Sequence, residues 1–239
     1  RYSPLSLRVG MLASVLSVVV ILLIGATTVW GRLYREEETE AGTVRRVAKN
    51  SLLPMIANLT GRLIDLGFAI IVVRTLGPEG QGKFALAIVF IGYFDIFTNF
   101  GLNVLLTREV ARDRSKANFY LSNTIVLRLL LWLVSLPVIA VYLAVMGLPW
   151  DTSWAIILFT IGLVPSNLAA ALSSVFNAYE RMEYPAAVTI ITTVLKVTLG
   201  SAALLAGWGI VGLAGASVFV NIGTVLILFY PLYTRFFRP

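Results

Sequence analysis

The sequence predicts an all-α fold, a polytopic bundle of about seven transmembrane helices. Mean hydropathy is +0.87. Of the 239 residues, 58% are hydrophobic and only 13% are charged, about half the charged share of a soluble domain. Apolar runs recur, and each is long enough to cross a hydrocarbon core of about 30 Å, which takes about 20 helical residues. The predicted spans are residues 9–31, 50–74, 83–107, 118–146, 152–176, 185–206 and 208–231.

Three parts follow one another along the chain. Residues 1–31 contain an extra N-terminal transmembrane helix, which we interpret as an anchor because its apolar run is long and no clear cleavage site follows. Residues 32–49 form a charged cytoplasmic linker, and residues 50–239 form a six-helix lobe. Because the chain starts with Arg1 and stops after one lobe, we expect it to be a fragment of a longer protein.

The first two spans of the lobe are joined by RTLGPEGQGKF, residues 74–84. This stretch is one residue short of the nucleotide-binding pattern G-x-x-x-x-G-K-[ST], because Phe84 stands where a hydroxyl would hold Mg²⁺. The flanking runs are too long and apolar for the strand and soluble helix that such a loop connects. We therefore interpret Gly77-Pro78-Glu79-Gly80 as a tight elbow between two membrane helices.

Lys and Arg are distributed unevenly between the two sets of loops. One set, which includes the linker and the loop around Arg112, holds twelve of them, whereas the other holds four. Short loops rich in Lys and Arg stay in the cytoplasm, which places the first set inside and the elbow outside a cytoplasmic membrane. The net charge of +7 is thus a topology signal. These short loops cannot build a basic surface for nucleic acid.

The composition also excludes several kinds of active site. The chain has no cysteine and no histidine, which excludes disulfides, thiolate metal sites and Ser-His or Cys-His catalytic pairs. No large extramembrane segment is predicted that could hold a catalytic domain. We therefore predict no catalytic residue, no cofactor and no metal, and a protein that is not an enzyme.

The remaining candidates are ionisable side chains inside the predicted spans, each of which costs about 2.5 to 3.5 kcal/mol at a helix centre. If the elbow folds the chain back on itself, Arg62 lies level with Asp95. Helical spacing then places two polar stripes opposite each other, which predicts a hydrated cavity with its charges near one depth. The five charged residues are Arg62, Asp65, Asp95, Arg128 and Lys196, and the second stripe comprises Gly92, Asp95, Asn99, Asn103 and Thr107.

A structural interpretation of the same charges stays open. Arg62 with Asp65 or Asp95 could be an ion pair that holds helices together, while Arg128 extends to the cytoplasmic interface. Three cations against two acids favour the cavity, because at least one cation is then left without a carboxylate. A single Lys196 inside a membrane helix needs an anion.

Four segments of the lobe are informative together: RRVAKNSLLPMIANLTGRLIDLGFAIIVVRTLGPEGQGKFALA, NFGLNVLLTREVAR, NAYERMEYPAA and LKVTLGSAALLAGWGIVGLAGASV. In their order and spacing they resemble the first half of polysaccharide and O-antigen flippases of the multidrug/oligosaccharidyl-lipid/polysaccharide exporter superfamily, and the likeness spans about residues 44–231. The resemblance implies an alternating-access transporter with two six-helix lobes around a cationic cavity. Its implied substrate is a lipid-linked oligosaccharide pyrophosphate, and its implied partners are membrane lipids and a second lobe. The helix at 9–31 is not part of the family's usual lobe.

With this resemblance, the polar residues inside the spans receive expected roles. We expect Arg62, Arg128 and Lys196 to bind the pyrophosphate, with Asn58 and Asn99 also at the substrate. We expect Asp65 or Asp95 to couple transport to a cation gradient. Two alternatives stay open. A multidrug exporter of the same superfamily would use a more acidic or aromatic pocket, and a membrane-embedded glycan polymerase or transferase would need interfacial carboxylates or a large loop.

Overall fold

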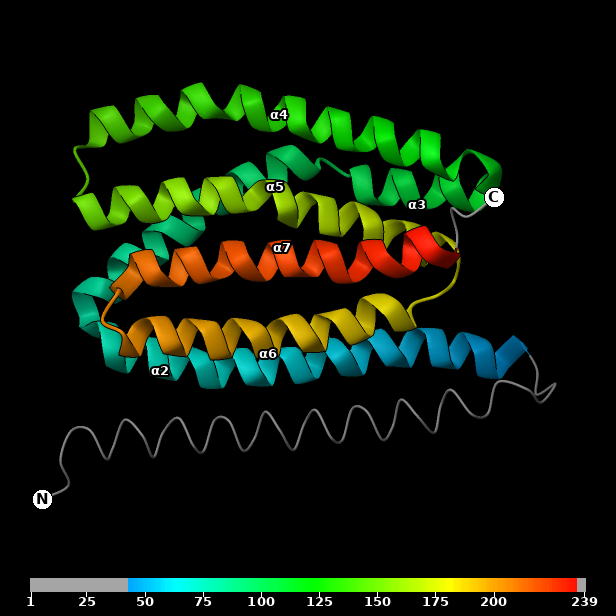
Figure 1. Cartoon of the computed structure of the whole chain (residues 1–239), viewed down its shortest axis with the longest axis horizontal. Coiled ribbons are helices and arrows are strands. Elements are labelled where there is room, and N and C mark those ends of the chain that lie inside the picture. Colours follow the sequence, from blue (N-terminus) through cyan, green and yellow to red (C-terminus); the bar gives the residue numbers. More distant parts are fainter. Residues whose placement is uncertain (1–42, 236–239) are drawn as a thin grey trace, which may run out of the picture.

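The structure is a computed structural model that describes the backbone of residues 43–235 (Figure 1). All its regular elements are helices, and there is no strand within 43–235, which confirms the all-α prediction. The predicted helix at 9–31 lies outside the described residues, as does linker segment 32–42. The elements are α2 (Thr43–Asn99), α3 (Leu102–Arg112), the 3-10 helix η1 (Arg114–Lys116), α4 (Ala117–Met146), α5 (Trp150–Ala178), α6 (Glu183–Leu205) and α7 (Gly209–Arg235).

The first helical segment contains two of the predicted spans. Five segments of the described part are long and apolar enough to cross a membrane, and the first, Pro54–Arg112, has 59 residues. A straight helix of that length would measure about 88 Å, far more than a bilayer core of about 30 Å. Gly77 interrupts it with φ 69° and ψ −178°, a conformation that glycine adopts without a Cβ clash. The chain therefore folds back at the predicted elbow, and Phe84 after it packs against Phe159 rather than near a phosphate site.

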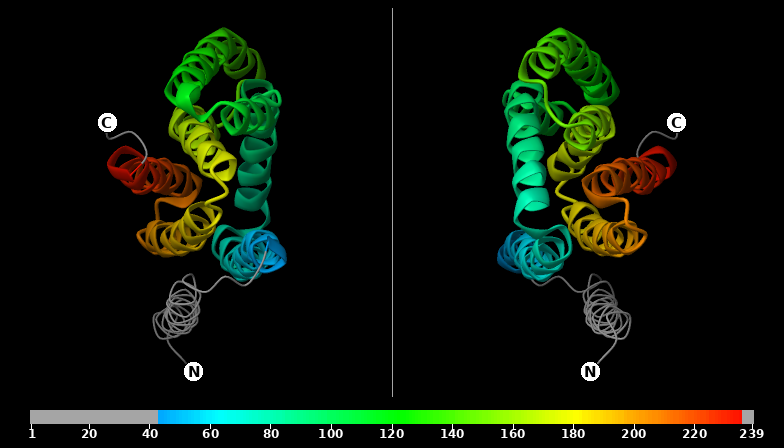
Figure 2. Two further views of the ribbon diagram at one scale, coloured as in Figure 1. Left: turned by 90° about the vertical axis from the view of Figure 1, so that its right-hand side faces the viewer. Right: turned by 90° about the vertical axis from the view of Figure 1, so that its left-hand side faces the viewer.

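The helices pack side by side with their axes roughly along one direction, except that the second half of α2 crosses the others obliquely (Figure 2). Helix α5 packs against α7, α7 against α6, and α6 against the first half of α2. Since α5 also contacts α2, α3 and α4, it is the central helix. The largest apolar cluster surrounds its second half, where Leu172, Val175 and Phe176 are buried against Leu106 of α3 and Leu228 of α7.

The first half of α2 and helix α6 run parallel and in register. A Cβ on Gly61 would lie 3.6 Å from the Thr193 hydroxyl oxygen, and one on Gly200 only 2.5 Å from the ring of Phe68. Between these two close approaches, Lys196 pairs with Asp65. We call this set of three neighbouring pairs the α2–α6 contact. Parallel packing is what two spans require when an odd number of crossings lies between them, and here three do: the second half of α2 with α3, then α4, then α5.

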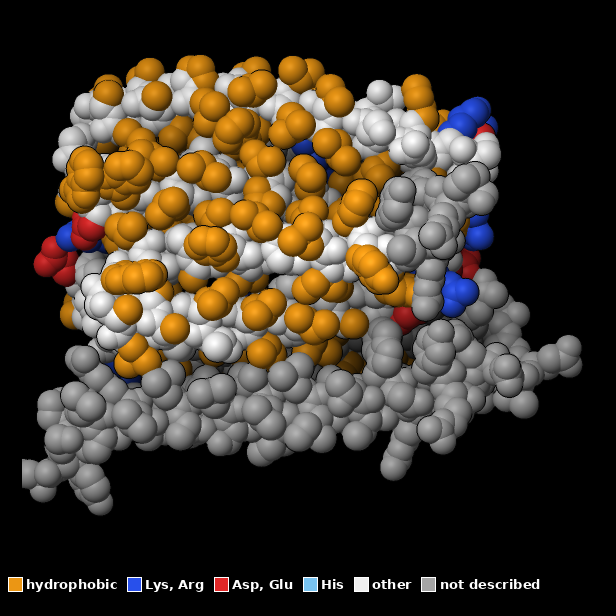
Figure 3. Space-filling view, in the orientation of Figure 1, with side chains coloured by type: hydrophobic (Ala, Val, Ile, Leu, Met, Phe, Trp, Pro, Cys, Tyr) orange, Lys and Arg blue, Asp and Glu red, His pale blue; other side chains and the backbone are white. Residues whose placement is uncertain are grey.

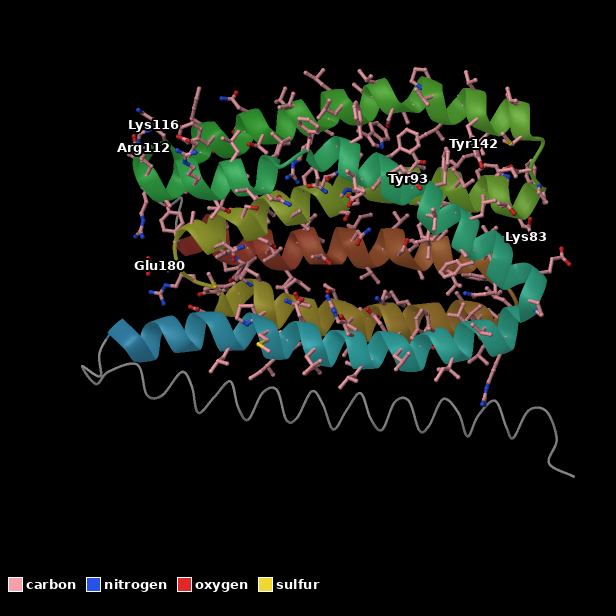
Figure 4. All side chains as sticks on the ribbon, turned by 180° about the vertical axis from the view of Figure 1, so that it is seen from behind. Lys83, Tyr93, Arg112, Lys116, Tyr142 and Glu180 are labelled. Atoms are coloured by element: carbon pink, nitrogen blue, oxygen red, sulfur yellow. The ribbon has the colours of Figure 1, made fainter. Side chains whose placement is uncertain are left out.

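Charged side chains gather mainly at the two ends of the bundle, and hydrophobic side chains cover the described face between them (Figure 3). Figure 4 shows Arg112, Lys116 and Glu180 at one end and Lys83 at the other. At the elbow end, Lys83 bridges Glu79 at 2.9 Å and Asp151 at 3.1 Å. The membrane orientation predicted from the Lys and Arg count stays a prediction.

The loop between α3 and α4 is fixed by local contacts at the basic end. Asp113 accepts hydrogen bonds from the backbone N–H and the hydroxyl of Ser115. These bonds, and the neighbouring Lys116 ammonium, lower the pKa of Asp113 below its usual value. The guanidinium of Arg114 lies 5.2 Å from the ring centroid of Tyr179, which ties this loop to the end of α5.

The predicted third span, 83–107, differs from a continuous helix. It is divided into the end of α2 and the separate helix α3, because Phe100 and Gly101 have φ angles of 28° and 76°. The sequence Asn99-Phe100-Gly101 explains the break locally, since Gly favours positive φ and Asn is a common helix-ending residue. The other predicted spans between 118 and 206 agree with α4, α5 and α6 within two residues at each end.

Candidate functional site

Arg128 is the most deeply buried charged side chain in the described part, with 1% of its surface exposed. It belongs to the inward face of α4, which repeats at helical spacing through Leu121, Thr124, Arg128 and Ser135. The predicted alternative, in which Arg128 extends to the cytoplasmic interface, does not describe this side chain. Its guanidinium points into the bundle toward α3 and α5.

Uncharged groups hold the guanidinium of Arg128. Its Nη1 donates to the backbone carbonyl of Asn167 on α5, and its Nη2 donates to Oδ1 of Asn103 on α3 over 2.6 Å. The hydroxyl of Ser174 donates to the same Asn103 oxygen over 3.1 Å. The third donor, Nε, is buried and has no hydrogen-bond partner in the described structure. The positive charge on α4 is therefore held by neutral oxygens from two other helices, α3 and α5.

A chain of side-chain amides connects this cation to a carboxylate. Asn103 Nδ2 donates to Asn99 Oδ1 over 3.3 Å, and Asn99 Nδ2 donates to Asp95 Oδ1 over 3.0 Å. The three residues are spaced four apart and stay on one face although the helix is broken between them. We call Arg128, Asn103, Asn99 and Asp95, with Asn167 and Ser174, the Arg128 centre.

The helix break leaves backbone groups unpaired beside the Arg128 centre. Phe100 N–H donates to the Ile96 carbonyl over 2.9 Å, and α3 starts with Val104 and Leu105 donating to the Gly101 carbonyl over 3.1 Å. Among the backbone hydrogen bonds outside the helices of the described part, none is donated by the N–H of Gly101. Helix α3 also lacks a side-chain cap at its N-terminus.

An open pocket of about 500 Å³ lies at this break. It is lined by Asp95, Ile96, Asn99, Phe100, Gly101 and Asn103. The pocket thus exposes the carboxylate end of the amide chain, while the guanidinium end stays buried. Phe100 projects from it with 82% of its surface exposed.

The remaining predicted residues lie on the first half of α2 and on α6. Asp65 and Lys196 form an ion pair, with 46% and 40% of their side-chain surfaces exposed. Lys196 therefore has a carboxylate partner, contrary to the expectation that it stands alone. Arg62 and Asn58 are exposed, and Arg62 makes no ion pair with a described residue.

The structure separates the five charges into two groups. The ion pair of Arg62 with Asp95, which the structural interpretation left open, is absent among the described contacts, because the first half of α2 lies beside α6 while Asp95 joins the amide chain toward Arg128. The polar stripe of Asp95, Asn99 and Asn103 does form one continuous network, as its spacing predicts. Asn167 and Ser174 were not predicted from the sequence, because an uncharged polar residue in a membrane helix is not a strong indication of a functional site.

No group of three or more His, Cys, Asp or Glu residues that could hold a metal ion occurs within the described part of the chain. The buried polar groups instead form hydrogen-bonded networks between membrane helices. Fold and site together define a polytopic helical membrane protein with a polar interior.

Comparison with protein families then gives the particular family. Residues 47–239 match the family described as "Polysaccharide biosynthesis protein". The match covers most of the chain, which therefore belongs to this family. Neither the comparison with curated proteins nor that with solved structures found a match. The family and the apolar helices make this a multi-pass membrane protein of polysaccharide biosynthesis.

Proposed function

We propose that this chain is one lobe of a transporter, not an enzyme, and that the transporter moves a polyprenyl-pyrophosphate-linked oligosaccharide across the cytoplasmic membrane. The lipid enters from the cytoplasmic leaflet and leaves into the outer leaflet by alternating access. A second six-helix lobe completes the substrate cavity. Membership of the polysaccharide biosynthesis family supports the glycan as cargo.

The observation that carries this proposal is Arg62, an arginine in a membrane-spanning helix that is exposed on the first half of α2 and has no carboxylate at ion-pair distance in the described part. Arg128 also lacks a carboxylate, but its guanidinium is already enclosed by neutral oxygens. Unpaired cations at membrane depth are costly and favour an anion. Guanidinium groups bind phosphate oxygens by paired hydrogen bonds. A pyrophosphate is therefore the substrate group that this lobe suits, with Arg62 as its first contact and Asn58 one helical turn away.

Ion coupling follows from the carboxylates. Asp65 holds Lys196 through one ion pair, and both side chains are half exposed. When an anionic headgroup takes Lys196, Asp65 is free to bind H⁺ or Na⁺, which gives the lobe two charge arrangements. Asp95 has no ion pair to exchange, because it is held by an amide and not by a cation, so we assign the coupling to Asp65.

Arg62→Gln in the complete protein tests the substrate role. Because Arg62 is exposed and unpaired, the variant should insert and accumulate normally, while surface glycan falls at least tenfold, as expected when a charged hydrogen bond of about 1.5 to 3 kcal/mol is lost. Arg74→Gln, an exposed arginine on the same helix beside the elbow, is the matched control and should export normally. Normal glycan export by Arg62→Gln would reject the assignment of Arg62.

Orientation is tested separately. A Glu79→Cys variant of this cysteine-free chain should react with an impermeant thiol reagent added outside intact cells. The Glu79 side chain is 85% exposed, so reaction only after permeabilisation would reverse the proposed orientation.

A further inference from the structure

The pocket at the break between α2 and α3 combines hydrogen-bond acceptors, donors and an aromatic ring. Asp95 uses Oδ1 to accept from Asn99, and its Oδ2 accepts no hydrogen bond within the described structure. The N–H of Gly101 is unpaired at the same place. Phe100 stands at the rim with 82% of its surface exposed. These groups are available to a ligand without breaking any contact of the Arg128 centre.

The mixture of groups excludes a simple ion as the preferred occupant. A phosphate would face the carboxylate of Asp95 and be repelled. A metal cation would face the uncapped N-terminus of α3 and, behind Asn103, the positive charge of Arg128. A neutral ligand with many hydroxyl groups avoids both conflicts, because each hydroxyl both donates and accepts. Such a ligand donates to Asp95 and accepts from backbone N–H groups in the same pocket.

The aromatic ring adds a second requirement. Phe100 has φ 28°, a conformation that is rare for a bulky residue and is usually kept where surrounding structure fixes it for a function. An exposed ring beside hydrogen-bonding groups provides a flat apolar surface next to polar contacts. A sugar ring meets both requirements. Its C–H groups form an apolar face that can lie on the Phe100 ring, and the hydroxyls around its edge can make the hydrogen bonds.

We infer that this pocket binds a sugar ring of the glycan that the substrate lipid carries, with hydroxyls at Asp95 and Asn99 and the apolar face of the sugar on Phe100. The inference rests on the proposed function and deepens it. It gives the second half of α2 the task of recognising the glycan, separate from the cationic groups that bind the pyrophosphate. Arg128 is then a positioning residue, which orients Asn103, Asn99 and through them Asp95.

The test compares two probes on the complete purified protein in lipid nanodiscs. One is polyprenyl pyrophosphate without sugar, and the other is the same lipid carrying the oligosaccharide of the organism that makes the protein. The parent protein should bind the glycosylated lipid more tightly. In Asp95→Asn and Phe100→Ala, affinity for the glycosylated lipid should fall about tenfold or more, whereas affinity for the sugar-free lipid should stay unchanged.

Two further variants keep the test decisive. Phe100→Tyr keeps a ring and should restore most of the affinity for the glycosylated lipid. Phe97→Ala removes an exposed ring of the same helix that does not line the pocket, and should bind both probes like the parent. If Asp95→Asn and Phe100→Ala keep the parent's preference for the glycosylated lipid, the sugar site is wrong although the transport proposal stands.

Other outcomes separate the two proposals further. If the parent binds neither probe, the proposed function is wrong and the sugar site falls with it. If Asp95→Asn and Phe100→Ala weaken binding of both probes equally, the pocket has a general structural role and the sugar site is again rejected.

Discussion

The α2–α6 contact and the Arg128 centre hold charge inside the same helical bundle in opposite ways. In the α2–α6 contact, Lys196 meets Asp65 directly, and both side chains keep nearly half of their surface exposed. In the Arg128 centre, the cation is buried and touches only neutral oxygens, and its nearest linked carboxylate, Asp95, is two amide side chains away.

This difference indicates different roles for the two regions. A half-exposed ion pair gains little from its own contact and can exchange partners at low cost. A buried cation held by dipoles from two neighbouring helices cannot leave without exposing those dipoles to an apolar interior. We therefore expect the α2–α6 contact to rearrange during transport, and the Arg128 centre to fix α3, α4 and α5 relative to one another.

The largest effect should come from Arg128→Ala. The substitution removes both hydrogen bonds of the guanidinium and leaves a cavity among α3, α4 and α5, so it should lower the free energy of unfolding by about 3 to 5 kcal/mol. Thermal unfolding of the complete protein in detergent, followed by loss of the monodisperse species on size exclusion, measures this.

Two variants control that measurement. Arg112→Ala removes an exposed arginine at the end of α3 and should change stability by less than about 0.5 kcal/mol. Arg128→Met keeps the volume of the side chain without its charge and should be less destabilising than Arg128→Ala. An Arg128→Ala protein as stable as Arg112→Ala would show that the centre does not hold the three helices together.

An intermediate effect is expected at Gly200, where the ring of Phe68 packs against the backbone of α6. A methyl group there would lie 2.5 Å from the ring of Phe68 and 3.3 Å from Leu213, so Gly200→Ala should cost about 1 to 3 kcal/mol. Gly67→Ala is the matched control, because nothing lies within 4 Å of its added methyl. The control should be neutral or stabilising by up to about 1 kcal/mol through helix propensity.

Restoration of stability in the Phe68→Leu, Gly200→Ala double variant would identify the ring as the obstacle. A Gly200→Ala protein as stable as Gly67→Ala would refute the close approach.

The sequence predicted the features of this helical bundle that depend on one helix at a time. Hydropathy predicted the spans between 118 and 206, and Gly77 with Pro78 predicted the elbow, because these signals are local. Helical spacing also placed Asp95, Asn99 and Asn103 on one face. Which helices are neighbours is not local, so the arithmetic that set Arg62 level with Asp95 could not decide whether the two residues touch. It treated the hairpin as straight and isolated, whereas α6 lies beside the first half of α2.

The break at Phe100 could have been suspected but not placed. Asn99-Phe100-Gly101 carries a helix-ending signal, yet such residues also occur inside continuous membrane helices, where neighbouring helices satisfy the backbone. Similarly, the partners of Arg128 come from α3 and α5, and only tertiary packing brings Asn103 and Asn167 to one guanidinium. Charge indicated that the residue mattered, and packing decided what it touches.

The smallest stability effect is expected at the ion pair of the α2–α6 contact. Because both side chains are half exposed, a double-mutant cycle with Lys196→Met, Asp65→Asn and the combined variant should give a coupling energy of at most about 1 kcal/mol. Transport should respond differently from stability. Asp65→Asn should fold normally and export glycan at a rate that no longer depends on an imposed H⁺ or Na⁺ gradient, since the amide cannot exchange Lys196 for a cation. A coupling energy well above about 2 kcal/mol would mean that the pair is a fixed strut like the Arg128 centre. The contrast between the two regions would then fail, because a pair that strong would be too costly to open in each transport cycle.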